Sequence, residues 1–223
     1  MSYKIVVMSC DKNEDLWKPF HDCMEKYWKN HPEIIYSTET KVNPYYKTIC
    51  RNLPINEWTQ RVRETIKDLP CRNILLTIDD LFLRDYVNND FIWSLQEYVD
   101  KPNVASLNFE FSFDSLDKPL DEKVLVRNPQ GRFKLSCMCQ MWKKKAILDL
   151  FNVHKDPWRF EKDNKAKGYT FLCSKYGDFL NWGKRKDDWH WGIVKGKWTQ
   201  ECKEFFDQEG IEIDYSKRGF ICK

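Results

Sequence analysis

The chain has 223 residues, enough for one substantial α/β domain, and its 32% charged and 42% hydrophobic residues exclude a disordered polypeptide. Its net charge of +3, from 37 basic and 34 acidic residues, argues against a protein that coats nucleic acid. No stretch approaches the ~20 apolar residues that span a bilayer, and the short apolar N-terminus lacks the basic region of a signal peptide.

Nine cysteines are spread singly along the chain, apart from the close pair Cys137 and Cys139. Because their number is odd and no second pair stands at zinc-finger spacing, we expect neither a disulfide framework nor a structural zinc site. Reduced thiols are typical of the cytosol. The sequence therefore predicts a cytoplasmic protein, with at most peripheral contact with the inner face of a membrane.

The first half of the chain alternates apolar runs with amphipathic stretches. Strands are expected at 3–9, 33–37, 74–78 and 104–109, and helices at 15–29, 56–68 and 90–99. Asn56 is expected to cap the second helix, and residues 38–56 are expected to be irregular. This alternation predicts a doubly wound, mostly parallel sheet between two helical layers, a three-layer α/β/α fold.

The second half of the chain is less regular. Short strands are expected at 123–127, 132–135, 169–174 and 189–194, and helices at 141–151, from Pro157 onward, and at 199–208. No repeat and no Pro- or Gly-rich linker divides the chain. A single domain covering 1–223 is therefore expected.

Asp79 and Asp80 follow directly after the apolar run 74–78. Ligands of open α/β sheets bind beyond the carboxyl ends of the strands. Two adjacent acids at that place are costly unless a positive charge neutralises them, and a divalent cation held between carboxylates and a phosphate does so. The alternative is an ordinary turn at the strand end, in which Asp80 caps the next segment.

Five segments fit one pattern by their order and spacing along the chain: Trp58–Arg61, Leu75–Leu83, Gln140–Trp142, Pro157–Glu161 and Trp189–Trp198. Together they resemble the motifs of small bacterial glycosyltransferases of the GT-A fold, which use nucleotide-diphosphate sugars to build surface polysaccharides such as capsule and O-antigen. The resemblance covers nearly the whole chain. It implies a nucleotide-sugar-binding half at 1–110 and an acceptor-binding half at 111–223, with a glycan or lipid-linked saccharide as acceptor.

Enzymes of this family hold the departing diphosphate with Mn²⁺ or Mg²⁺ on an Asp-x-Asp motif, where the metal acts as a Lewis acid. Here the two acids are adjacent, which leaves open which of them touches a metal. We expect Asp80 to be the ligand and Asp79 to face the ribose or the sugar. The resemblance also implies that His190 completes the metal shell, since a neutral imidazole is a suitable Mn²⁺ ligand.

Further contacts with the donor are expected from the loops after the first two strands, from one helix and from a late turn. These residues are Ser9, Asp11, Thr38, Thr40, Arg61, Lys195 and Lys197. The arginine fork suits a phosphate, and Gly196 between the lysines lets the backbone approach a diphosphate. Plainer alternatives are an ordinary loop acid for Asp11 and polar residues at a strand end for Thr38 and Thr40. For the arginine the alternative is an ion pair with Glu57 or Glu64, and for the lysines a solvated turn.

Glu161 is the expected general base. The resemblance implies a carboxylate that takes the proton of the acceptor hydroxyl during in-line attack on the anomeric carbon, and thus an inverting reaction. Partial burial in the rigid aromatic turn would raise its pKa. Trp158 is expected to floor the acceptor pocket, and Gln140 and Trp142 to shape it. The alternative for Glu161 is an acid that favours the dipole of a helix start.

Two other functions suit the same fold. A sugar-1-phosphate nucleotidyltransferase normally has a Gly-rich loop after the first strand, whereas residues 9–14 contain no glycine. A non-catalytic nucleotide- or glycan-binding domain is compatible with the altered Asp-x-Asp motif. A retaining reaction also stays open, because a fold does not fix stereochemistry.

Overall fold

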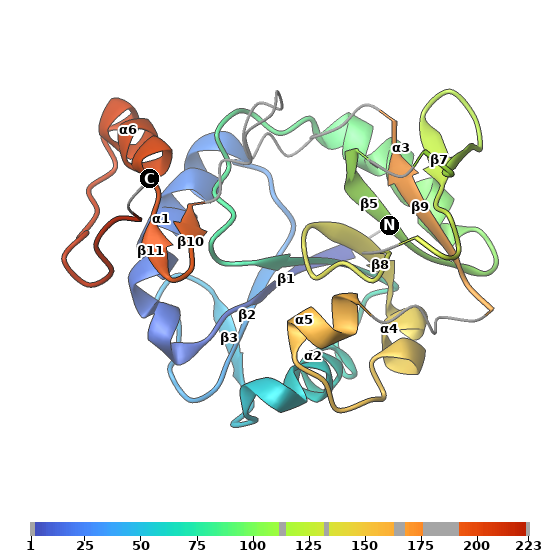
Figure 1. Ribbon diagram of the computed structural model, residues 1–223, viewed down its shortest axis with the longest axis horizontal. Helices are drawn as coiled ribbons and strands as arrows, with labels where there is room; N and C mark the ends of the chain where they lie inside the picture. Colours follow the sequence, from blue (N-terminus) through green and yellow to red (C-terminus); the bar gives the residue numbers. More distant parts are fainter. Residues whose placement is uncertain (1–2, 112–114, 132–133, 163–167, 176–191, 222–223) are drawn as a thin grey trace.

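The computed structural model describes residues 3–111, 115–131, 134–162, 168–175 and 192–221 (Figure 1). Its centre is a nine-stranded sheet of order β3-β2-β1-β4-β8-β5-β9-β7-β6. The strands are β1 (Tyr3–Met8), β2 (Ile34–Thr38), β3 (Lys47–Cys50), β4 (Asn73–Ile78), β5 (Val104–Phe111), β6 (Lys118–Pro119), β7 (Val124–Val126), β8 (Gln140–Lys143) and β9 (Thr170–Ser174). All except β7 and β8 run in one direction, which confirms the mostly parallel sheet.

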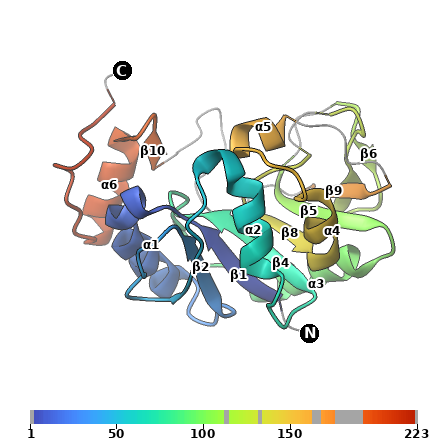
Figure 2. The same cartoon turned by 90° about the horizontal axis from the view of Figure 1, so that it is seen from below.

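Helices cover both faces of this sheet (Figures 1 and 2). They are α1 (Glu14–Tyr27), α2 (Trp58–Ile66), α3 (Asn89–Asp100), α4 (Lys144–Leu150), α5 (Pro157–Glu161) and α6 (Gln200–Glu209), with short 3₁₀ turns η1 (Asp11–Asn13) and η2 (Ile55–Glu57). A small hairpin of β10 (Ile193–Val194) and β11 (Lys197–Trp198) precedes α6.

Two hydrophobic clusters separate the three layers. Alternate residues of a strand point to opposite faces, so Ile5 and Val7 of β1 join the cluster under α1, α3 and α6, while Val6 and Met8 join the cluster under α2, α4 and α5. Burial on both faces explains the unbroken apolar run of β4. The expected three-layer α/β/α architecture is confirmed.

The C-terminal hairpin and α6 are docked on the chain just after the acid pair. Trp198 stacks on Phe82 with ring centroids 5.9 Å apart, and Phe206 of α6 meets the Phe82 ring edge-on at 5.1 Å. A Cβ atom on Gly192 would come within 2.3 Å of the Phe82 ring and 3.2 Å of the Asp80 carbonyl oxygen. Only a glycine allows the backbone this close to the residues that follow β4.

Three element predictions are wrong. The stretch expected to be one helix at 141–151 begins with β8, and only its second part is α4. The apolar residues of β8 are buried in the sheet between β4 and β5. The sequence pattern of such a short buried run does not distinguish a strand from a helix. Strand β3 lies inside the segment expected to be irregular, and α2 follows η2 with no side-chain cap, so Asn56 is not its cap.

Apart from the strands expected at 132–135 and 189–194, the remaining predicted elements were found with shifted ends. The strand expected at 189–194 is described only as β10, because 189–191 lie outside the described residues. Residues 132–133 also lie outside the described residues. Residues 134–135, the described part of the strand expected at 132–135, do not form a strand. None of the described helices has the length and apolarity needed to cross a bilayer, and the eight described cysteines are free.

Candidate functional site

The predicted donor residues that follow β1, β2 and β4 lie at one edge of the sheet. Met8 of β1 pairs in register with Ser37 of β2 and with Ile78 of β4, so the residues that follow these three parallel strands leave the sheet side by side. The antiparallel strand β8 enters the sheet at the same edge, since its first residue Gln140 pairs with Leu76. The segment before β8 therefore lies next to the acid pair, on the side away from β1.

Asp79 is the centre of a hydrogen-bond network at this edge. Its side chain is 1% exposed, and it accepts hydrogen bonds from the Ser9 hydroxyl and, at 3.1 Å, from the Asn13 amide nitrogen. The Trp17 indole nitrogen donates to Ser9 Oγ at 2.8 Å. Because an indole can only donate, Ser9 Oγ accepts there and its own proton is directed to Asp79.

The two acids share an electrostatic cost. Burial, followed by the charge of Asp80, raises the pKa of Asp79 to about 7, although Ser9 and Asn13 act in the opposite direction. Burial also raises the pKa of Asp80 to about 6, although its backbone hydrogen bond and the Arg218 guanidinium oppose this shift. Two carboxyls with raised pKa values at a strand end are typical of a functional site.

Asp80 differs from Asp79 in what its oxygens contact. Its Oδ1 atom is buried and has no hydrogen-bond partner among the described residues, whereas both oxygens of Asp79 accept hydrogen bonds. A buried, unpaired carboxylate oxygen is unfavourable unless a cation or donor binds it. This oxygen fits the metal-ligand role expected of Asp80.

Among the described residues, no three His, Cys, Asp or Glu side chains gather around one point. A cation at Asp80 would therefore draw its other ligands from water, from a bound phosphate, or from beyond those residues. His190, the second predicted ligand, lies outside the described residues.

Arg61 is buried beside the first strand end, and neither alternative ion pair forms. Its guanidinium is 3% exposed, donates to the Ser9 backbone carbonyl at 2.8 Å and forms an ion pair with Glu39. The Glu39 carboxylate also accepts from the Asp11 backbone N–H at 2.6 Å. Arg61 thus joins the loop after β1 to the loop after β2, and its contact with the donor stays a prediction.

Asp11 fixes the backbone of the second loop. Its carboxylate accepts from the backbone N–H groups of Thr40 at 3.1 Å and Lys41 at 3.0 Å, and from the Thr40 hydroxyl at 2.5 Å. Burial acts to raise the pKa of Asp11, but these hydrogen bonds together hold it below its usual value. Thr38 has no exposed surface, and its hydroxyl donates to the Lys41 carbonyl at 2.6 Å. Both threonines therefore shape this loop.

Glu161 lies at the same edge of the sheet, beside the segment that leads into β8. Its Oε1 atom accepts the Cys137 backbone N–H at 2.8 Å, and burial raises its pKa against the opposing effect of that hydrogen bond. It ends α5, whose Asp156 cap and first-turn Pro157 fix the start of the helix. Glu161 therefore lies in the last turn of a five-residue helix, so the alternative role at a helix start does not apply.

The predicted acceptor residues differ in exposure. Trp158, one turn before Glu161, is 64% exposed and free to contact a ligand. Trp142 has no exposed surface and packs edge-on against Phe151 and Phe171, so it is a core residue and can act on an acceptor only through its neighbours. Gln140 is also fully buried and donates to Ser106.

Lys195 and Lys197 lie on the hairpin of β10 and β11. Lys195 and Gly196 have φ values of 51° and 78°, as in the type I′ turn of a two-residue hairpin. Both lysines are exposed, and no described contact joins them to the acid pair. Their place in the donor site stays a prediction.

Three residues of this edge were not chosen from the sequence: Glu39, Asn13 and Arg218. Arg218 forms a two-point ion pair with Asp15, at 2.6 and 2.8 Å, and donates to Asn13 Oδ1 at 2.9 Å. Glu39 could have been found, because it directly follows a predicted strand. The contacts of Arg218 join positions about 200 residues apart, and no local pattern indicates them.

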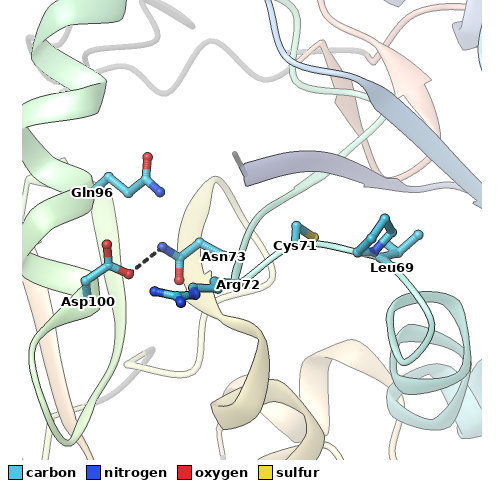
Figure 3. A pocket seen from close by; sticks show the side chains of 7 residues that line it. Leu69, Cys71, Arg72, Asn73, Gln96 and Asp100 are labelled. Carbon is cyan, nitrogen blue, oxygen red and sulfur yellow. Dashed lines mark hydrogen bonds between the residues drawn. The ribbon is translucent and has the colours of Figure 1, made fainter. Parts of the chain in front are cut away.

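A cavity of about 540 Å³ lies at the opposite edge of the sheet, around the start of β4 (Figure 3). Leu69, Cys71, Arg72, Asn73, Gln96 and Asp100 line it, and Asn73 donates to Asp100 at 2.9 Å. Because Asn73 is at the amino end of β4 and Asp79 follows its carboxyl end, this cavity is separate from the predicted donor site.

No family model matches this sequence, and no curated protein sequence is similar to it. Among solved structures, the chain is similar to S. aureus TarS, with a TM-score of 0.49 and 11% identity over 78% of this chain but only 35% of that chain. TarS residues 1–349 are also seen in complex with UDP. A cytidylyltransferase from Leptospira borgpetersenii serovar Hardjo-bovis has a TM-score of 0.45 and 11% identity, over 72% of this chain and 68% of that one.

HddC from Yersinia pseudotuberculosis has a TM-score of 0.47 and 16% identity, over 78% of this chain and 89% of that one. These TM-scores are all below 0.5. The function of this chain must therefore be inferred from its own site.

Proposed function

We propose that this protein is a GT-A glycosyltransferase that moves a sugar from a nucleotide diphosphate to a glycan or lipid-linked saccharide. The observation that carries this proposal is the acid pair at the carboxyl edge of the sheet, in which Asp79 is held by hydrogen bonds and Asp80 Oδ1 is buried without a partner among the described residues. A diphosphate with its cation supplies the positive charge that this pair lacks.

The nucleotide is proposed to bind where the loops after β1 and β2 meet. Arg61, Glu39 and the Ser9 carbonyl offer a fixed set of donors and acceptors there. A carboxylate such as that of Glu39 accepts a hydrogen bond from the ring N–H of uracil, thymine or guanine, or from the exocyclic amino group of cytosine. The binding screen described below therefore has to identify the base.

A Mn²⁺ or Mg²⁺ ion bound at Asp80 would stabilise the negative charge that develops on the leaving diphosphate. The protein's own contribution is to hold Asp80 in place. Its carbonyl lies against Gly192 and the residues after it pack on Trp198, so the C-terminal segment fixes the backbone of this acid. Asn13 and Ser9 fix the neighbouring Asp79.

Glu161 is proposed to be the general base. Partial burial raises its pKa, so it is a stronger base than an exposed glutamate, while the Cys137 N–H keeps the carboxylate oriented. The acceptor sugar is proposed to stack on the exposed Trp158 indole, with its attacking hydroxyl facing Glu161. A base on one side and the diphosphate on the other would give in-line attack with inversion.

The first experiment is a thermal-shift screen of UDP-, GDP-, CDP- and dTDP-sugars with and without Mn²⁺. A bound ligand stabilises the folded protein by about 2.7 kcal/mol at a hundredfold excess over its Kd. We expect a shift with one nucleotide family that grows with Mn²⁺, and Asp80→Asn should remove the Mn²⁺ dependence. Asp68→Asn, at an exposed acid away from the site, is the matched control.

Turnover separates this proposal from its alternatives. Transfer or slow hydrolysis of the bound donor supports a glycosyltransferase, whereas release of pyrophosphate from a nucleoside triphosphate and a sugar-1-phosphate would identify a nucleotidyltransferase. Donor binding with neither reaction would indicate a binding domain. Activity on a soluble acceptor together with no binding to liposomes would count against contact with a membrane.

A further inference from the structure

The segment 214–221 returns from α6 to the predicted donor site. The Trp198 N–H donates to the Gly219 carbonyl at 3.0 Å, and the Ile221 N–H donates to the Trp198 carbonyl at 3.0 Å, so this tail is paired with β11. The Gly219 N–H closes a turn onto the Tyr215 carbonyl at 2.9 Å, and its φ of 60° suits a glycine. The turn presents Arg218 from a fixed backbone.

The Arg218 side chain is directed by Asp15 at the start of α1. Its Nε and Nη2 atoms donate to the two carboxylate oxygens at 2.6 and 2.8 Å, and both side chains are about one-tenth exposed, at 11% and 10%. This two-point contact orients the planar guanidinium. The same Nη2 atom then donates to Asn13 Oδ1 at 2.9 Å.

We propose that Arg218 is a positioning residue of the donor site, which acts through the Asn13 amide to orient the Asp79 carboxylate. A guanidinium can only donate, so the Asn13 atom that faces it is the carbonyl oxygen. The NH₂ group of Asn13 then faces Asp79 and donates to Oδ1 at 3.1 Å. A protonated carboxyl can donate as well as accept, so Arg218 is the contact that fixes this amide whichever state Asp79 is in.

The hydrogen-bond network around Asp79 therefore ends on each side in a group that can only donate a hydrogen bond. Trp17 directs the Ser9 proton to one carboxylate oxygen, and Arg218 directs the Asn13 NH₂ group to the other. With both oxygens engaged, the carboxylate cannot rotate without losing a hydrogen bond. A consequence is that the C-terminal tail is part of the donor site, although about 140 residues separate it from the acid pair in the sequence.

This role of Arg218 rests on the proposed function, so its test needs one measurement that does not require a bound nucleotide sugar. We would follow the side-chain amide protons of Asn13 by NMR in the ligand-free protein. We expect two well-separated, slowly exchanging signals in the wild type and in Lys217→Gln, and averaged, faster-exchanging signals in Arg218→Gln. Lys217 is the matched control because its Nζ lies 3.5 Å from the same Asp15 carboxylate but does not contact Asn13.

Donor affinity gives the second readout. Loss of a charge-assisted hydrogen-bond relay should weaken binding about tenfold in Arg218→Gln, with partial recovery in Arg218→Lys and no change in Lys217→Gln. Asn13→Ala removes the donor to Asp79 without adding a charge beside the acid pair, and it leaves the ion pair of Arg218 with Asp15 in place. This variant should lose about as much affinity for the nucleotide sugar as Arg218→Gln. The double variant should lose no more affinity than either single variant.

The inference is overturned if the Asn13 signals are unchanged in Arg218→Gln, whatever the protein binds. It is also overturned if the two losses of donor affinity add, because Arg218 would then act independently of Asn13. If the Asn13 signals change as expected while the wild type binds no nucleotide sugar with Mn²⁺ present, the positioning contact stands and the proposed function fails.

Discussion

Above neutral pH, we expect the folded protein with Asp79 to be less stable than the variant Asp79→Asn. Its pKa rises from 3.8 to about 7 on folding, so the folded state holds a proton that the unfolded state has lost between these values. Stability therefore falls as pH rises from about 4 to about 7 and is constant above that range. Asp79→Asn has no carboxyl to ionise and so avoids this loss of stability, which corresponds to about 4 kcal/mol at pH 8.

The amide of Asp79→Asn can be accommodated with little loss. It could accept from Asn13 and donate to Ser9 Oγ, since the Ser9 hydroxyl has a second acceptor, the Cys10 carbonyl, at 3.4 Å. That contact is longer than the present one, and the exchange costs about 1 kcal/mol. We therefore expect Asp79→Asn to raise the free energy of unfolding at pH 8 by about 3 kcal/mol, because the avoided ionisation cost exceeds the weakened hydrogen bond by that amount.

Urea unfolding followed by circular dichroism, in EDTA at pH 4, 6 and 8, would measure this effect. The gain should vanish at pH 4, near the pKa of the unfolded carboxyl, and Asp68→Asn should change stability by less than about 0.5 kcal/mol at every pH. A variant that is less stable than the wild type at pH 8, or a gain that does not depend on pH, would refute the burial argument.

Three further results are expected. Glu161→Gln keeps the acceptor for the Cys137 N–H, so it should abolish transfer while donor affinity and melting temperature stay near wild type; loss of donor binding as well would indicate a structural role. Trp158→Ala should raise the KM for acceptor with no loss of stability, whereas Trp142→Ala should cost about 3–5 kcal/mol in urea unfolding, and equal stability losses would contradict the assigned exposures. Gly192→Ala should loosen the C-terminal segment from Phe82, seen as faster proteolysis after residue 192, and unchanged proteolysis would mean that this contact is not needed for docking.

The fold was largely predictable because its strands and helices have regular apolar patterns. The runs that became β1, β2 and β4 are bounded by polar residues, and α1 and α2 have clear helical spacing. Strand β8 was not predictable in this way, because three of its four residues are buried and the strand leads without a break into α4. Tertiary pairing with β4 and β5 decides its structure.

From chain order alone, the candidate site was predictable only where its residues follow strands, whereas Arg61 and Glu161 were chosen from the resemblance. Asp79, Asp80, Ser9 and Asp11 could be placed together, since parallel strands end at one edge. Trp142 and Trp158 were both predicted to contact the acceptor, but the structure buries Trp142 and exposes Trp158. Neither periodicity nor composition distinguishes a core tryptophan from an exposed one. Contacts between distant segments are not recorded in local patterns at all.

The two acids are held together at a cost that the surrounding residues do not remove. Asp79 has three polar residues arranged behind it, Ser9, Asn13 and, through Asn13, Arg218, and its pKa is nevertheless raised. Asp80 has a buried oxygen that accepts no hydrogen bond from any described residue. A turn that only needed to end a strand would be more stable with one acid or none. The proposed cation at Asp80 would offset this cost, because its charge would favour the ionised form of both acids against the burial and the repulsion that raise the pKa of Asp79. The energetic cost in the free protein therefore supports the proposal of a cation at this edge of the sheet.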